Sequence, residues 1–175
     1  DLSRLDTLIA PQAAYLQPET GTRLLEFARQ GKQLILIGLC GAYDPYKNED
    51  GKLFDACGIV PIGRKASPLS DGSRVAPLLT VEEFGPASIA YESMEPEKTR
   101  VILRYDDGTP AAISVPFGKG EIIYCGFSMT GFADQMNPIA GQLLAKPLAG
   151  RFTFSKDPAA RLFTWQGDDD FRYVF

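Results

Sequence analysis

Residues 5–38 read LDTLIAPQAAYLQPETGTRLLEFARQGKQLILIG, a stretch with two short apolar runs and a helix-patterned segment between them. The runs, residues 5–10 and 33–38, are typical of parallel strands that are buried on both faces. Pro18 suits the first turn of a helix, and Gly31 suits the left-handed residue that ends one. The stretch therefore predicts a strand, a helix and a second strand, which together form an α/β unit.

The loops that follow the two strands are the expected binding positions. A right-handed crossover places residues 11–17 and 39–51 beyond the carboxyl ends of the strands, where open α/β sheets bind ligands. Residues 52–57, followed by Gly58, predict a short helix with a glycine stop. Residues 61–85 are rich in Gly, Pro and Ser, so we expect mostly loop there.

The pattern changes at residue 87 to short strands separated by glycine-containing turns. These turns favour antiparallel pairing, so we expect one meander formed by residues 87–92, 100–105, 110–115 and 121–126. Farther along, residues 138–148 predict a helix with Asn137 as its N-cap. Alternating residues in 151–155, 161–165 and 171–175 predict strands, the last two forming a hairpin.

Composition limits the function classes. The 175 residues have room for one domain with a small appendage. Eighteen basic residues are spread among 22 acidic ones without a basic run, and no apolar stretch approaches the roughly 20 residues that cross a bilayer. We therefore expect neither a nucleic acid nor a membrane as a partner. The chain has no histidine, which excludes Ser-His-Asp and Cys-His catalysis and histidine-ligated metals within it.

The three cysteines, Cys40, Cys57 and Cys125, lack the CxxC spacing of zinc sites and lie among apolar residues or glycines. We expect buried free thiols, and no metal or cofactor.

Residues 5–38, the following LCGAYDP and residues 105–127 (YDDGTPAAISVPFGKGEIIYCGF) resemble the trimerisation domain of bacterial β-galactosidases of the family 42 type. DGTPA with the glycine-kinked FGKG is the most specific part of this resemblance. It implies a flavodoxin-like, three-layer α/β domain, similar in fold to class I glutamine amidotransferases, with added antiparallel strands. It also implies that the chain is truncated at its N-terminus, where the family has an earlier strand–helix–strand portion.

The resemblance further implies a non-catalytic domain that helps to assemble a homo-oligomer, a trimer in that family. Such a domain walls the active site of a catalytic barrel, which would lie outside this chain. Residues 1–150 would form the partial trimerisation-type domain, and residues 151–175 would begin a C-terminal β-sandwich module. Tyr43, Pro45 and Tyr46 are the interface candidates, because exposed tyrosines supply contact area at low entropic cost. The alternative is that they line a cleft toward the barrel.

Two enzyme-like or binding alternatives stay open. Gly38, Cys40 and Gly41 resemble a degenerate nucleophile elbow of a Cys-dependent amidotransferase, although no histidine is present to activate the thiol. A carbohydrate-binding module is the other alternative, with sugar stacking on the tail aromatics Phe163, Trp165, Phe171 and Tyr173.

Acidic residues offer no convincing catalytic pair of the kind that glycoside hydrolysis needs. Asp44, Glu49, Asp50 and Asp55 lie among lysines and turn formers, which indicates a solvated loop. The run from Asp168 to Asp170 lacks the Gly and Glu of a calcium loop and indicates a polar hairpin tip. We therefore assign no catalytic residue.

Overall fold

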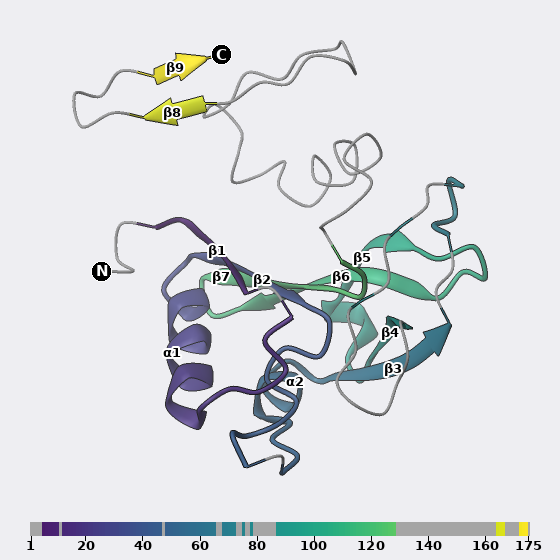
Figure 1. The fold of residues 1–175 in the computed structure, drawn as a ribbon, viewed down its shortest axis with the longest axis horizontal. Coiled ribbons are helices and arrows are strands. Elements are labelled where there is room, and N and C mark those ends of the chain that lie inside the picture. Colours follow the sequence, from purple (N-terminus) through teal and green to yellow (C-terminus); the bar gives the residue numbers. More distant parts are fainter. Residues whose placement is uncertain are drawn as a thin grey trace.

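The computed structural model describes residues 5–10, 12–46, 48–65, 68–72, 75, 78, 87–128, 164–166 and 172–174. Its main element is a five-stranded mixed sheet with strand order β1-β2-β7-β6-β5 (Figure 1). Two more sheets have two strands each, β3-β4 and β8-β9. The elements are β1 (Thr7–Ala10), α1 (Pro18–Arg29), β2 (Gln33–Ile37), α2 (Lys52–Cys57), β3 (Ile59–Lys65), β4 (Ala87–Ser93), the 3-10 turn η2 (Pro96–Lys98), β5 (Arg100–Arg104), β6 (Pro110–Phe117), β7 (Gly120–Cys125), β8 (Thr164–Gln166) and β9 (Arg172–Val174).

The predicted α/β unit is confirmed. β1 and β2 pair in parallel, β2 lies between β1 and β7 in the sheet, and all five residues of β2 are buried. Helix α1 begins with Pro18 at its first turn and buries Leu24, Phe27 and Ala28 against the core. Gly31, at a φ of +100°, follows the helix end as predicted. The short helix α2 and its left-handed Gly58 are confirmed as well.

The predicted meander is right for three of its four strands. β5, β6 and β7 pair antiparallel in sequence order, and β7 then pairs in parallel with β2, which joins both halves of the chain into one sheet. The placement of β4 in this meander is wrong, because β4 pairs antiparallel with β3 instead.

The expectation of loop from residue 61 is wrong for residues 61–65, which belong to β3. Pro61 and Gly63 weaken the local strand pattern, but β3 has β4 as its only strand partner among the described strands, and an edge strand tolerates proline. The pairing with β4 joins residues more than 20 positions apart, which local periodicity does not reveal.

Three buried tyrosines tie the elements together. The Tyr124 hydroxyl donates to the carbonyl of Leu53 in α2 (2.7 Å), and its ring lies 5.4 Å from that of Phe54. The Tyr105 hydroxyl lies 3.0 Å from the Ile89 carbonyl and 3.1 Å from that of Gly126. Tyr91 on β4 packs against Tyr124 at 5.6 Å between centroids. These contacts fasten α2 and the β3-β4 ribbon to the main sheet.

The FGKG turn lies against the end of α1. A Cβ atom on Gly120 would come within 2.1 Å of the Lys32 carbonyl oxygen and 2.3 Å of that of Ala28. Gly118 has a φ of +61°, and a Cβ atom on it would lie 2.7–2.8 Å from atoms of Arg29. The turn therefore needs glycine at both positions, so that β7 can enter beside β2.

The two edges of the main sheet differ. The β5 edge is covered by residues 68–70, where Leu69 bridges to Tyr105 and the Ser70 amide donates to the Arg104 carbonyl (2.9 Å). Among the described strands, β1 has only β2 as a partner, and Ile9 on it is 41% exposed.

The terminal hairpin is confirmed in its described part, where β8 and β9 pair antiparallel. The predicted helix at residues 138–148 and the strand at 151–155 lie outside the described residues. No helix within the described part of the chain is both long and apolar enough to cross a membrane.

Candidate functional site

The two loops at the carboxyl ends of β1 and β2 are joined by backbone hydrogen bonds. The amide of Tyr43 donates to the Ala14 carbonyl (3.0 Å), and the amide of Leu16 donates to the Tyr43 carbonyl (3.0 Å). Gly41 is held in the same way by the Ala13 carbonyl (2.9 Å). The parallel pairing of β1 with β2 thus continues past the strand ends, and the loops behave as one surface.

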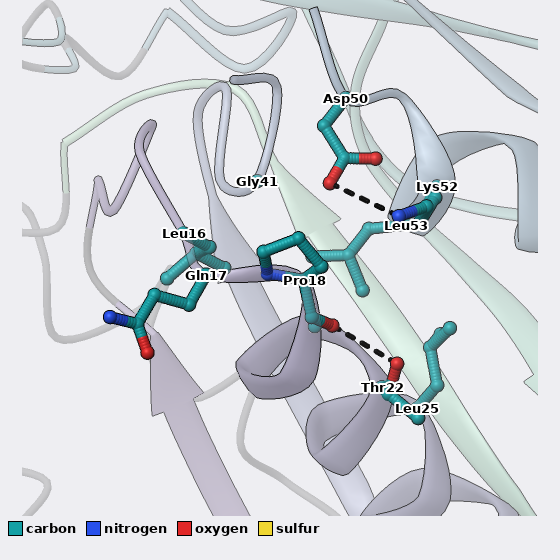
Figure 2. A pocket seen from close by; sticks show the side chains of 10 residues that line it. Leu16, Gln17, Pro18, Thr22, Leu25, Gly41, Asp50, Lys52 and Leu53 are labelled. Carbon is teal, nitrogen blue, oxygen red and sulfur yellow. Dashed lines mark hydrogen bonds and ion pairs between the residues drawn. The ribbon is translucent and has the colours of Figure 1, made fainter. Parts of the chain in front are cut away.

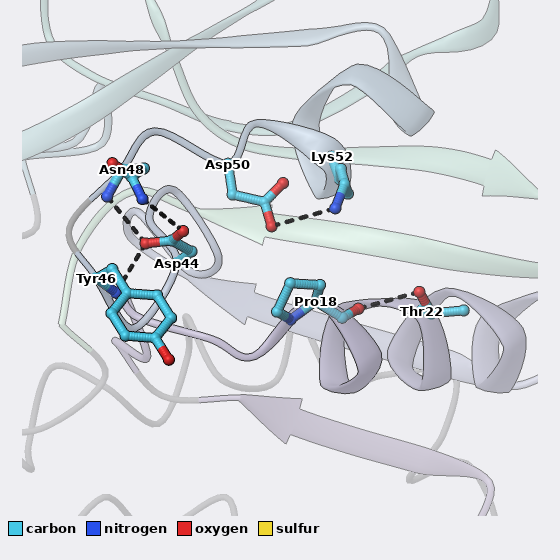
Figure 3. A network of polar contacts seen from close by, with 7 residues as sticks. All are labelled: Pro18, Thr22, Asp44, Tyr46, Asn48, Asp50 and Lys52. Atoms are coloured by element: carbon cyan, nitrogen blue, oxygen red, sulfur yellow. Dashed lines mark hydrogen bonds and ion pairs between the residues drawn. The ribbon is translucent and has the colours of Figure 1, made fainter.

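The tip of the second loop is organised by one carboxylate (Figure 3). Asp44 Oδ1 accepts from the backbone amides of Tyr46 (2.8 Å) and Asn48 (2.9 Å), while Oδ2 accepts from Asn48 Nδ2 (2.8 Å). The Asp44 amide donates in return to the Asn48 carbonyl (2.8 Å), and Tyr43 and Glu49 form a bridge below the tip. Hydrogen bonds, first of all from the Asn48 side chain, hold the pKa of Asp44 below its ordinary value.

Aromatic side chains that are exposed or half-buried lie on these two loops. The rings of Tyr15 and Tyr43 are 5.5 Å apart, Tyr15 is 39% exposed, and Tyr46 at the tip is 85% exposed. Pro45 is exposed as well. We call these four residues the loop surface. Tyr15 is not among the interface candidates that the sequence predicts. The signal that could have identified it is the expected position of residues 11–17 and 39–51 at the same end of the sheet.

A small cavity lies between the N-terminal ends of α1 and α2, beside residues 16, 17 and 41 of the two loops (Figure 2). Its volume is about 50 Å³, far below the roughly 300–1,000 Å³ of pockets that hold organic ligands. Asp50 and Lys52 form an ion pair at its wall (3.7 Å), and the Thr22 hydroxyl donates to the Pro18 carbonyl (3.0 Å). The cavity has room for water rather than for a sugar ring.

The candidate elbow is closed to solvent. Cys40 is fully buried, and this burial raises the pKa of its thiol to about 12, so the thiol is protonated at neutral pH. Gly38 and Gly41 have φ angles of +70° and +74°, and a Cβ atom on them would crowd Leu78 and Leu53 respectively. The glycines thus serve a tight, packed turn, and this geometry gives no support to a nucleophilic cysteine.

The predicted burial of the other cysteines is confirmed, since Cys57 and Cys125 are buried and free. Burial raises the pKa of the Cys125 thiol to about 12 and also raises that of Cys57. The two thiols are therefore protonated core side chains at neutral pH.

The acidic candidates do not gather into a site. Glu49 and Asp55 are exposed, and Asp50 is paired with Lys52. Within the described residues, no three His, Cys, Asp or Glu side chains are grouped so as to hold a metal ion. In the tail, Trp165 and Tyr173 are register partners in β8-β9, whereas Phe163, Phe171 and residues 168–170 lie outside the described residues.

A comparison with protein families finds a match over most of the chain. The sequence profile of the β-galactosidase trimerisation domain matches residues 1–146. No curated protein matches the chain.

Similar solved structures include the GH42 β-galactosidase Gan42B from G. stearothermophilus, with a TM-score of 0.61 and 23% identity over 84% of this chain and 22% of that one. The cold-adapted β-galactosidase from Rahnella sp. R3 has a TM-score of 0.62 and 17% identity over 91% of this chain and 25% of that one. The β-galactosidase from Bacillus circulans sp. alkalophilus has a TM-score of 0.61 and 19% identity over 84% of this chain and 23% of that one.

These structural similarities show a shared mixed α/β fold, and this chain spans about a quarter or less of the length of those proteins. The profile covers most of the chain, including the loop surface and every strand of the main sheet. The chain belongs to the β-galactosidase trimerisation domain family, the non-catalytic domain of these glycoside hydrolases.

Proposed function

We propose that this domain holds copies of its parent protein together through the loop surface. The observation that carries the proposal is Tyr46, which is 85% exposed although the tip beneath it is held by three hydrogen bonds to Asp44. A large side chain on an ordered support binds a partner with little further loss of entropy. Tyrosine is also among the residues most enriched in the energetic centres of interfaces.

A closed trimer sets a second requirement. Its interface is heterologous, so the loop surface of one copy meets a different surface of the next. Val60 and Ile62 on β3 are 42% and 38% exposed, and Met94 beside Gly58 is 73% exposed. We call these three residues the ribbon surface. Val60 and Ile62 follow the loop surface in the sequence after helix α2, Met94 follows β4, and the ribbon surface is our candidate for the complementary face.

The parent protein is, in this proposal, a glycoside hydrolase whose catalytic barrel lies outside this chain and whose active site this domain walls. Support comes from the family and from the much greater length of the similar β-galactosidases. The parallel β1-β2-β7 core with α1 supports a flavodoxin-like, amidotransferase-like architecture. The end of the profile match at residue 146, and the separate β8-β9 sheet, support a boundary near residue 150.

Sedimentation velocity of the full chain over a range of concentrations tests the association. We expect a trimer that forms with increasing concentration, and a shift toward monomer in the double variant Tyr43→Ala plus Tyr46→Ala. Lys119→Ala, an exposed change before β7 at the opposite end of the sheet, is the matched control and should leave the trimer intact. A 19.1 kDa species alone at every concentration would refute self-association.

A further inference from the structure

The tip that carries Tyr46 has few apolar contacts to keep it in one conformation. Pro45, Tyr46 and Asn48 are all exposed, so burial contributes little to their order. Among the described residues of the tip, the side-chain hydrogen bonds converge on Asp44, whose two oxygens accept from two backbone amides and one side-chain amide. Charge-assisted bonds of this length, 2.8–2.9 Å, are the stronger kind.

We infer that Asp44 is a positioning residue for self-association: its carboxylate fixes the conformation in which Tyr46 meets the next copy. This inference rests on the proposed function of the loop surface. Asp44 itself is turned toward Asn48 and the backbone of the tip, as Figure 3 shows, and its oxygens are occupied by bonds within its own loop. Its effect on association therefore acts through Tyr46 rather than through a contact of its own.

Two charged residues near Asp44 are described, Lys52 at the start of α2 and Glu49 in the same loop. The positive charge of Lys52 favours the ionised form of Asp44, but it is the weakest of the effects on the pKa of Asp44. Lys52 also lies 3.7 Å from the carboxylate of Asp50, with which it forms an ion pair. Glu49 follows Asn48 in the same loop and is exposed. Among the described residues, the hydrogen bonds from Tyr46 and Asn48 are what hold the carboxylate in place.

The chain offers a matched control at a second aspartate turn. Asp107, in the turn between β5 and β6, accepts from the Thr109 amide (3.0 Å) and the Thr109 hydroxyl (2.7 Å) through Oδ1. Asp44→Ala and Asp107→Ala therefore remove the same kind of support from two exposed turns. Only the first turn carries a residue of the loop surface.

The test combines amide hydrogen exchange with sedimentation of the full chain. In Asp44→Ala we expect the Tyr46 and Asn48 amides to lose protection and the association constant to fall by about tenfold. Asp44→Asn should restore most of the amide protection and most of the association. The Oδ1 of the new asparagine still accepts from the two backbone amides, and the Asn48 side chain can turn so that its oxygen accepts from the new side-chain amide. Asp107→Ala should leave association unchanged.

Three results would overturn the inference. Unchanged association in Asp44→Ala, with Tyr46→Ala weakening it, would remove the role of Asp44 and leave the proposed interface standing. Equal weakening in Asp44→Ala and Asp107→Ala would show a general loss of stability instead of positioning. Unchanged association in Tyr46→Ala would refute the proposed surface itself, and the inference with it.

Discussion

The hydroxyl of Tyr91 on β4 donates a 3.0 Å hydrogen bond to the carbonyl of Gly38, the residue at which β2 turns into the loop that leads to Tyr43. Both partners are buried, and Tyr91 is fully so. Desolvation raises the pKa of Tyr91 well above its ordinary value, so its hydroxyl remains a donor throughout the working pH range. The Tyr91 side chain thus links the β3-β4 ribbon to the start of the loop that carries Tyr43.

Tyr91→Phe should destabilise the chain by about 1–3 kcal/mol, because the Gly38 carbonyl keeps its buried position and loses its side-chain donor. Urea unfolding measures this. Tyr46→Phe is the control, since that side chain is 85% exposed and its change should stay within about 0.5 kcal/mol. Equal stability of the two variants would contradict the role assigned to this bond.

Gly120→Ala should prevent normal folding or cost more than about 3 kcal/mol, because the new methyl group would overlap two backbone carbonyls on the path from α1 to β2. Gly63→Ala on β3 is matched to it, since a Cβ atom there meets nothing within 4 Å. Thermal unfolding should separate the two variants clearly. A normal melting temperature in Gly120→Ala would mean that β7 enters the sheet differently.

The native chain should react slowly with a small maleimide at neutral pH. Cys40 and Cys125 are completely buried with thiol pKa values of about 12, and Cys57 is buried with a raised pKa. In denaturant all three cysteines should react quickly with the maleimide, and mass spectrometry counts the labels on each chain. Fast labelling of Cys40 in the folded chain, or glutamine hydrolysis that Cys40→Ala abolishes, would revive the amidotransferase alternative.

Order in the tip should depend on pH through Asp44. Its pKa in the folded chain lies below the ordinary 3.8, so the contribution of the charged carboxylate is fully present above pH 3.8 and is lost as pH falls through the lower, folded value. An NMR titration of the Tyr46 and Asn48 amides should follow this step. Asp44→Asn should abolish it, and a step that persists in that variant would assign the titration to another group.

The ribbon surface should also contribute to association. Val60→Thr plus Ile62→Thr keeps β-branched residues in β3 and removes exposed apolar area, so the fold should survive while the trimer weakens. Sedimentation of this variant, and of its mixture with the Tyr43→Ala plus Tyr46→Ala variant, gives the test. A heterologous interface predicts that the mixture regains some association, because each variant keeps one intact face. No change in the ribbon variant would exclude this face.

The sequence by itself determined those helices, strands and turns whose start and stop signals lie within a few residues of one another. Pro18 and Gly31 bracket α1, Gly58 ends α2, and the turns at DDG and FGKG separate β5, β6 and β7. The burial of the cysteines and the common position of the two loops also followed from local pattern and from the geometry of a parallel pair.

Only the tertiary structure decided how distant segments pair. It placed β7 beside β2, took β4 out of the meander to pair with β3, and brought Tyr15 against Tyr43. The physical reason is that strand partners are chosen by packing and by backbone hydrogen bonds between residues far apart in the chain, for which local periodicity carries no information. The loop surface depends on that choice, because Tyr43 and Tyr15 become neighbours only when β1 and β2 lie in register.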